Sequence, residues 1–408
     1  MSYKILCALI LAVLMCSWSF NKTFADDQMM TPSVSTELVV HEWGTFTALS
    51  DGQGVMLDWQ PLSGPSDLPS FVYVAQNLAD NIEERTGIRC HYSGKGCQRG
   101  SVRMETPVIY FYGATTPTEV TVKVDFPGGM ITEWYPKARF VNQETIDWGR
   151  FIVAPSEPGP LLTESAPSHY YPARETDAQQ VRFCDSPHGG NSDLSFQFEQ
   201  FLFYRGLGSP KLPVTVSLSD NHINFSYEGL GSSPKFIVFD RAGDAIGISL
   251  VEPNKSKTQT TTRPERTKTL HDVLATLKTQ LIANGLFEKE ADAMIKTWRD
   301  TWFEDGLRIF VILPREQTDA MLPLTINPTP KHMERVIVAR IEVLTPEQEL
   351  AVTKAVQNLK TASASDLPAL RDTFFAKHGH FGEALILRLL DKSPDSEERT
   401  ILNSLLAK

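Results

Sequence analysis

Hydrophobic and polar residues alternate with a period of two through most of the chain, from Glu37 to about Leu344. The alternation is clearest over 118–126, where three valines and a phenylalanine share one face and polar side chains share the other. The Pro-Gly-Gly sequence over 127–129 then predicts a hairpin turn into a second strand. Many short strands separated by turns are typical of antiparallel sheets, and we expect a sandwich. Further strands are predicted at 38–47, 108–112, 148–153, 194–204, 214–218, 223–227, 236–239, 245–251, 307–313 and 335–343.

Turn and loop signals divide these strands. The Asp-Arg-Ala-Gly sequence over 240–243 predicts a tight turn between two of them. Residues 155–180, rich in Pro, Ser and Glu, predict a long loop, and residues 253–268 predict a flexible crossing.

Helical spacing replaces the alternation after residue 268. Five apolar side chains within 270–281 fall on one face of a helix, and Gly285 follows where a helix C-cap is expected. A second helix is predicted over 288–302, with Trp298 and Trp302 one turn apart. Two such helices can form a DNA-binding helix-turn-helix, but a packed αα-hairpin fits an acidic, exported chain better.

The last segment, 345–408, is also predicted to be helical. Thr345 begins a capping box with Pro at the first helical position, and Ser393-Pro394 repeats this arrangement before the last helix. We therefore expect three or four packed helices at the C-terminus.

These patterns together predict an α+β protein. Its expected parts are an antiparallel β-sandwich-like body over 26–252, an inserted helical hairpin with returning strands over 253–344, and a C-terminal helical subdomain over 345–408.

The first 25 residues predict a signal peptide. One lysine precedes an apolar run over 5–20, and small residues indicate cleavage after Ala25. Met15 stands where a lipoprotein signal has a small residue, which argues against a lipid anchor on Cys16. No later segment is apolar enough to span a membrane. We therefore expect an exported, soluble protein of the periplasm or the cell exterior.

The chain is acidic, with a formal net charge of −10 at pH 7. Cleavage would make it more acidic, because the first 25 residues contain two lysines and no acidic residue. An acidic chain without a basic run is a poor match for nucleic acid or for an anionic membrane. We therefore expect neither as a partner, and the sequence does not identify a partner of another kind.

Three cysteines remain after the predicted cleavage. In an oxidising compartment Cys90 and Cys97 can close a small loop by a disulfide, and the glycines between them permit the tight turn. Cys184 is then left over, either buried or available to the thiol of a partner. A different pairing of the three stays open.

Two groups of residues could in principle bind a metal. Cys184 and His188, with the other two cysteines, supply soft ligands for zinc or copper, but their spacing matches no standard motif. His378 and His380 flank Gly379, which stands where the preceding helix needs a left-handed C-cap. A disulfide and a helix cap explain these residues without a metal, and we expect no cofactor.

The first strand of the body holds a polar pair in an apolar setting. Alternation places His41 on one face and Glu42 on the other. His41 can be a ligand or base and Glu42 an acid, or both can be core side chains with satisfied hydrogen bonds. Arg205, at the end of an apolar strand, needs a partner because it stays charged. We expect Glu42 to be that partner.

Five segments in combination resemble an uncharacterised family of exported bacterial proteins. They are HEWGTFT (41–47), METPVIYFY (104–112), FLFYRGLG (201–208), WFEDGLRIFVILPR (302–315) and LPLTINPTP (322–330). The strand pair that starts with PVIYFY is also similar to a wider exported group with a PVIYLYP-type strand pair. The resemblance covers most of the mature chain and implies export and architecture, but it implies no reaction.

The favoured hypothesis is an exported binding or structural module, since the chain has no nucleophile elbow, P-loop or dinucleotide-binding motif. The alternative is a hydrolase or metal-dependent enzyme with a site around His41, Glu42 and Arg205, and whether the protein is an enzyme stays open. An enzyme requires His41 or Glu42 in an open pocket beside another titratable group. A structural role requires both to be buried and bonded to the backbone or to Arg205.

Overall fold

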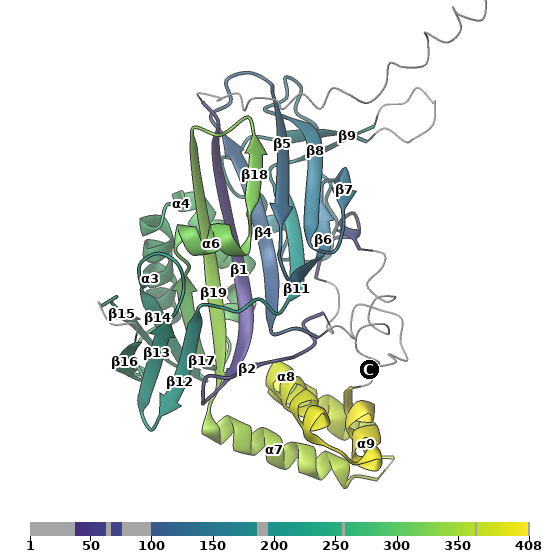
Figure 1. Ribbon diagram of the computed structural model, residues 1–408, viewed down its shortest axis with the longest axis vertical. Helices are drawn as coiled ribbons and strands as arrows, with labels where there is room; N and C mark the ends of the chain where they lie inside the picture. The colour runs from purple at the N-terminus through teal and green to yellow at the C-terminus, as the bar shows by residue number, and fades with distance from the viewer. Residues whose placement is uncertain are drawn as a thin grey trace, which may run out of the picture.

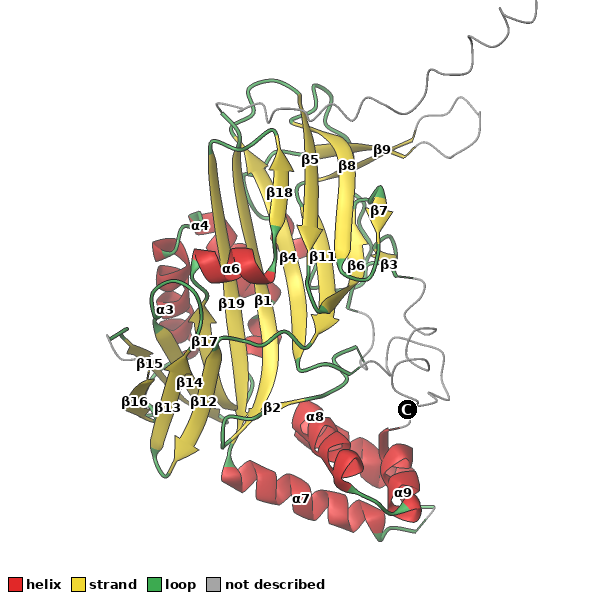
Figure 2. Cartoon of the chain, in the orientation of Figure 1, coloured by secondary structure: helices red, strands yellow, loops and turns green. Residues whose placement is uncertain are grey.

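The computed structural model describes residues 37–62, 67–75, 99–185, 195–254, 258–363 and 365–406. The predicted signal peptide, the predicted Cys90–Cys97 disulfide and His188 lie outside the described residues. Within them the protein is α+β, with large antiparallel sheets, a helical hairpin and a C-terminal group of three helices (Figures 1 and 2). The predicted fold class is confirmed.

A ten-stranded main sheet runs through the molecule in the order β15-β14-β17-β19-β1-β4-β11-β6-β3, with β2 paired to β1. The central pair β1 and β19 is parallel, and the other pairs in this sheet are antiparallel. The strands are β1 (Val39–Asp51), β2 (Met56–Leu57), β3 (Tyr73–Val74), β4 (Val102–Tyr112), β6 (Gly129–Tyr135), β11 (Leu202–Gly208), β14 (Phe236–Ala242), β15 (Ala245–Val251), β17 (Gly306–Ile312) and β19 (His332–Leu344).

Two smaller sheets cover one face of the main sheet. The first has the order β10-β9-β8-β5-β18 with β7 paired to β8, and the second has the order β12-β13-β16. Apolar side chains from all three sheets form one core, which includes Val40, Val122 and Ile223. The strands are β5 (Thr118–Asp125), β7 (Phe140–Val141), β8 (Thr145–Val153), β9 (Val181–Asp185), β10 (Ser195–Glu199), β12 (Val214–Ser219), β13 (His222–Tyr227), β16 (Thr258–Thr262) and β18 (Leu324–Asn327).

A helical hairpin covers part of the opposite face of the main sheet and forms a second core there (Figure 2). It consists of α3 (Leu270–Ala283), α4 (Glu288–Thr297) and α5 (Arg299–Trp302). A capping box begins α3, and Gly285 follows it with a φ of +109°. Trp298 and Trp302 are both buried in this core, as a packed hairpin requires, but Trp298 separates α4 from α5.

Two short helices lie in connections between strands. The 3-10 helix η2 (Tyr171–Arg174) falls in the predicted loop over 155–180, and α6 (Arg315–Met321) follows β17.

The turn after β5 does not form the predicted hairpin. The chain turns at Gly128, but β5 pairs with β8 and β18, whereas β6 pairs with β11 and β3. The burial pattern explains the difference. Exposed and buried positions alternate along β5, while most side chains of β6 are buried on both faces of the main sheet. The turn therefore carries the chain from one sheet to the other. The predicted crossing over 253–268 likewise contains a strand, β16.

The C-terminal helices α7 (Pro346–Lys360), α8 (Leu367–Lys392) and α9 (Ser396–Leu406) pack around a core of their own. They lie at one end of the main sheet (Figure 1). Ala384 and Phe381 of α8 join them to Trp59 and Leu344 of the body, and Arg388 pairs with Asp51 at 3.1 Å. Among the described helices, none is long and apolar enough to cross a membrane.

Candidate functional site

The side chains of His41 and Glu42 point to opposite faces of β1, as alternation predicts. Glu42 lies in the core between the sheets, where it accepts a hydrogen bond from Tyr204 Oη at 2.6 Å and pairs with Arg335 Nε. Arg335 also pairs with Asp319 at 2.7 Å. Burial and the neighbouring Glu42 carboxylate raise the pKa of Tyr204. Glu42 is therefore a buried, bonded side chain that cannot share a site with His41.

Arg205 does not pair with Glu42, and that prediction is wrong. Arg205 lies on the same face of β11 as Phe203, the hairpin side of the main sheet, where its Nη1 and Nη2 bind the two oxygens of Asp67 at 2.7 and 2.8 Å. Nη2 also donates to Thr106 Oγ1 at 3.2 Å, and Thr106 has a φ of +47°. Although burial opposes its ionisation, the Arg205 guanidinium holds the pKa of Asp67 well below its ordinary value.

His169 extends this network towards the surface. Its Nδ1 lies 2.9 Å from Asp67 Oδ2 and its Nε2 lies 2.9 Å from Asp300 Oδ2. The hydrogen bond to Asp67 raises the pKa of His169 despite partial burial, and Asp300 acts in the same direction. Because both ring nitrogens face carboxylates, His169 bridges the loop that holds Asp67 and the end of the hairpin, and protonation of the ring strengthens this bridge.

A charged row continues across the same face of the main sheet. Cross-strand register places Arg308 beside Glu342, and Arg340 beside Thr47. Arg340 pairs with Glu342. Burial raises the pKa of Glu342, but the neighbouring Arg340 and Arg308 lower it more strongly, so the pKa falls to about 2. Arg103 lies 3.5 Å from Glu105 and completes the row. Since each buried charge here faces an opposite one, we assign these residues a structural role.

His41 is a buried residue, 1 % exposed, that lines a pocket at the other end of the sheet face, and here the structure gathers titratable groups. Its Nδ1 lies 2.8 Å from Glu290 Oε2 in α4. The same carboxylate accepts hydrogen bonds from Tyr112 Oη at 2.8 Å and from the Phe287 backbone N–H at 2.7 Å. Glu290 is fully buried, so these three donors fix both the carboxylate and the imidazole ring.

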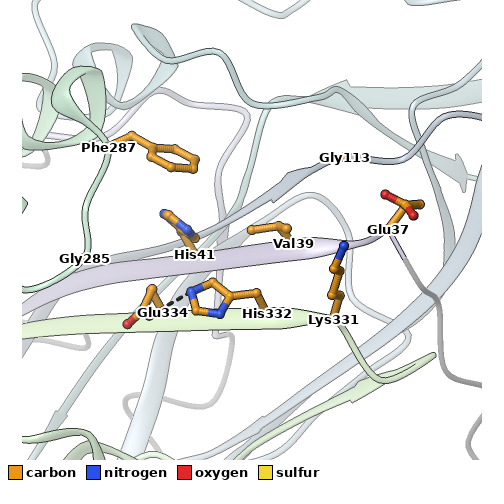
Figure 3. Close-up of a pocket in the computed structure, with 9 residues that line it drawn as sticks. All are labelled: Glu37, Val39, His41, Gly113, Gly285, Phe287, Lys331, His332 and Glu334. Carbon is orange, nitrogen blue, oxygen red and sulfur yellow. Dashed lines mark ion pairs between the residues drawn. The ribbon is translucent and has the colours of Figure 1, made fainter.

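The pocket has a volume of about 490 Å³, within the range of small-molecule sites. Figure 3 shows Val39 and His41 on β1, His332 and Glu334 on β19 and the Phe287 ring across from the strands. The imidazole and Phe287 ring centroids lie 4.3 Å apart. His332 Nε2 pairs with Glu334 at 2.8 Å. The lining residues are Glu37, Val39, His41, Gly113, Gly285, Phe287, Lys331, His332 and Glu334.

Local sequence explains how the pocket forms. Gly285 ends the turn after α3, and Phe287 is the N-cap residue of α4, with Glu290 three positions later. The backbone N–H of Phe287 therefore reaches the Glu290 side chain, half of a capping box. Gly113 has a φ of +75°, and a Cβ there would lie 2.3 Å from the backbone oxygen of Glu37. Glycine is thus required at the rim.

Of the cysteine and histidine candidates for a metal site, the structure describes Cys184, His378 and His380, and these three are not grouped. Cys184 is a free, exposed thiol on β9. His378 packs against Phe374 and His380 against Trp59, at centroid distances of 5.1 and 4.5 Å. Gly379 has the expected positive φ, +48°, but α8 resumes after it, so it marks a kink rather than the helix end. Among the described residues, no three His, Cys, Asp or Glu side chains are grouped as metal ligands.

Sequence reasoning missed the residues that complete both networks. Glu290 gave no signal, because a capping box is recognised by Ser, Thr, Asp or Asn at the N-cap and this helix has Phe287 there. Asp67 and His169 stand in loops without periodicity. His332 and Glu334 do alternate into β19 on the His41 face, but only knowledge of the β1–β19 pairing reveals that.

Comparison with known proteins supplies no further guide to this site. No protein-family model matches the sequence, and no curated protein matches it.

Proposed function

We propose that this protein is an exported binding module that holds a small ligand in the pocket beside His41. The observation that carries the proposal is the fixed imidazole of His41 at an open pocket. Glu290 engages Nδ1, so Nε2 is the ring nitrogen left to meet a ligand. A histidine held in one orientation by a buried carboxylate is a preorganised hydrogen-bonding group, and preorganisation lowers the entropy lost on binding.

Export supports a binding role outside the cytoplasm and rests on the sequence. The first 25 residues have the charged, apolar and small-residue regions of a signal peptide. Cell fractionation with an antibody against the mature chain tests this part. We expect the protein in the periplasm or the medium, and a cytoplasmic location would contradict export.

Ligand screening by NMR tests the pocket. We would add a set of fluorinated fragments with aromatic, carboxylate, amine and hydroxyl members to residues 26–408 and record ¹⁹F line broadening. We expect some fragments to bind the wild type and to bind His332→Ala more weakly. This substitution removes an exposed lining side chain without disturbing the buried Glu290. Lys211→Ala is the matched control, because Lys211 is an exposed residue outside the lining. Failure of every fragment, and of the probes in the next subsection, to bind would overturn the proposal.

A second candidate, acid–base catalysis, is favoured by the bond between His41 and Glu290. A carboxylate on Nδ1 fixes the tautomer in which Nε2 can take a proton from a hydroxyl group or water, as in hydrolases. Glu42 and Arg205 do not reach this site, since they bond to Arg335 and Asp67. A panel of nitrophenyl esters and glycosides tests this candidate, and we expect any hydrolysis to disappear in His41→Gln. No hydrolysis by the wild type would leave binding as the function.

A further inference from the structure

We infer that the ligand of the His41 pocket is a hydroxyl-rich molecule, a saccharide, and this inference rests on the proposed binding function. Three features of the lining carry it: an exposed aromatic ring, a balanced set of charged groups and a fixed imidazole.

The aromatic ring is Phe287, which is 48 % exposed although it lies among buried neighbours. The His41 ring packs against it at 4.3 Å, and the Tyr112 ring meets it edge-on at 5.1 Å. These contacts hold the ring in one orientation. Figure 3 shows it across from the strands. A fixed, solvent-facing ring is a platform for the apolar C–H face of a sugar, because burying that face removes apolar surface from water.

The charged groups argue against the other ligand classes. Glu37 and Glu334 are acidic, whereas Lys331 and His332 are basic, and His332 already pairs with Glu334 at 2.8 Å. A strongly anionic or cationic ligand would meet charges of its own sign. A purely apolar ligand would strip water from charged groups without replacing their hydrogen bonds.

Hydroxyl groups suit this lining, because each one both donates and accepts a hydrogen bond. Carboxylates at Glu37 and Glu334 accept, Lys331 donates, and His41 Nε2 accepts when Glu290 holds the proton on Nδ1. Gly113 and Gly285 add no side chain to the lining, which leaves room for a ring-shaped molecule. Alternating hydroxyls around an apolar face are the chemistry of a sugar.

Saturation-transfer NMR with maltotriose, chitotriose and xylotriose as probes tests this inference on residues 26–408. We expect at least one to bind with transfer concentrated on its ring C–H protons. Phe287→Ala should raise its Kd about tenfold, which corresponds to about 1.4 kcal/mol, because the platform for the C–H face is lost. Phe287→Tyr should keep the platform and the affinity. Ile282→Ala is the matched control, because Ile282 is an exposed apolar residue of the same hairpin outside the lining.

The outcomes separate this inference from the binding function. If fluorinated fragments bind the pocket and no saccharide does, the ligand class is wrong and the binding function stands. If a saccharide binds Phe287→Ala as tightly as the wild type, it occupies another surface and the inference is also wrong. If neither fragments nor saccharides bind, both proposals fail.

Discussion

Glu290 Oε2 lies 2.8 Å from His41 Nδ1, although the two residues are 249 positions apart in the chain. His41 comes from the first described strand and Glu290 from the inserted hairpin, so the hairpin both covers the sheet and completes the pocket. The hairpin is therefore the element on which the proposed site depends.

Glu290→Gln should destabilise the protein and loosen His41. The amide has only one acceptor oxygen, whereas the carboxylate receives donors from His41, Tyr112 and the Phe287 backbone. A buried donor left without a partner costs about 1–3 kcal/mol of the free energy of unfolding. Urea unfolding measures that loss, and ¹⁵N NMR of the His41 ring should show a smaller fraction with the proton on Nδ1. Glu334→Gln is the control, because its partner His332 is exposed, and equal losses would contradict the assignment.

Asp67→Asn should be among the more damaging single changes in the body. It removes the charge opposite Arg205, whose side chain is 2 % exposed, and leaves a buried guanidinium uncompensated. Breaking a buried pair from one side costs about 3–5 kcal/mol. Urea unfolding tests this against Asp292→Asn, which removes an exposed partner of Lys278 and should cost less than about 1 kcal/mol. The double variant Asp67→Asn with Arg205→Met should recover part of the loss, and no recovery would argue against an uncompensated charge.

His169 should make stability depend on pH in the neutral to alkaline range. Its pKa in the folded protein is raised above the ordinary value of 6.5 by Asp67 and Asp300. The stabilisation is therefore complete below 6.5 and is lost as the pH rises through the folded pKa. We expect the difference in unfolding free energy between the wild type and His169→Gln to be constant below pH 6.5 and to shrink as the pH rises above it.

The matched variant for that titration is Asp67→Asn. The pKa of Asp67 is lowered, so its stabilisation is present above 3.8 and is lost only in acid. The part of its destabilisation that comes from the lost Arg205 pair should therefore persist as the pH rises, whereas the part that comes from the lost His169 pair should disappear. If the difference in unfolding free energy between the wild type and His169→Gln stays constant with pH, the histidine contributes packing rather than charge.

Local patterns predicted the elements that depend on local chemistry. The helix α3 was predictable because its apolar positions and its cap lie within a few residues of one another, and the β14–β15 hairpin because its turn residues fix the pairing. The pairing of β5 was not predictable in this way. Its alternation identifies a strand with one buried face, but it does not identify which of two neighbouring sheets buries that face.

The partners of the candidate residues depend on pairings between distant segments. Glu42 and Arg335 meet because β1 and β19 run in parallel, and 293 positions separate them. Alternation did predict that His41 and Glu42 face opposite ways, which separates the two candidates correctly. It could not predict that Asp67 binds Arg205, because Asp67 lies in a loop without periodicity.

The exposed thiol of Cys184 should be the only reactive thiol of the mature protein if Cys90 and Cys97 form the disulfide that their spacing predicts. Cys184 lies on β9 with its side chain at the surface, so Ellman's reagent should reach it in the folded protein. We expect one reactive thiol per chain before and after denaturation without reductant, and none in Cys184→Ser. Three reactive thiols after denaturation would contradict the Cys90–Cys97 disulfide. If the wild type purified from its native compartment has no reactive thiol, Cys184 is already bound to another thiol. Reductant should then release that thiol, and its mass would identify it.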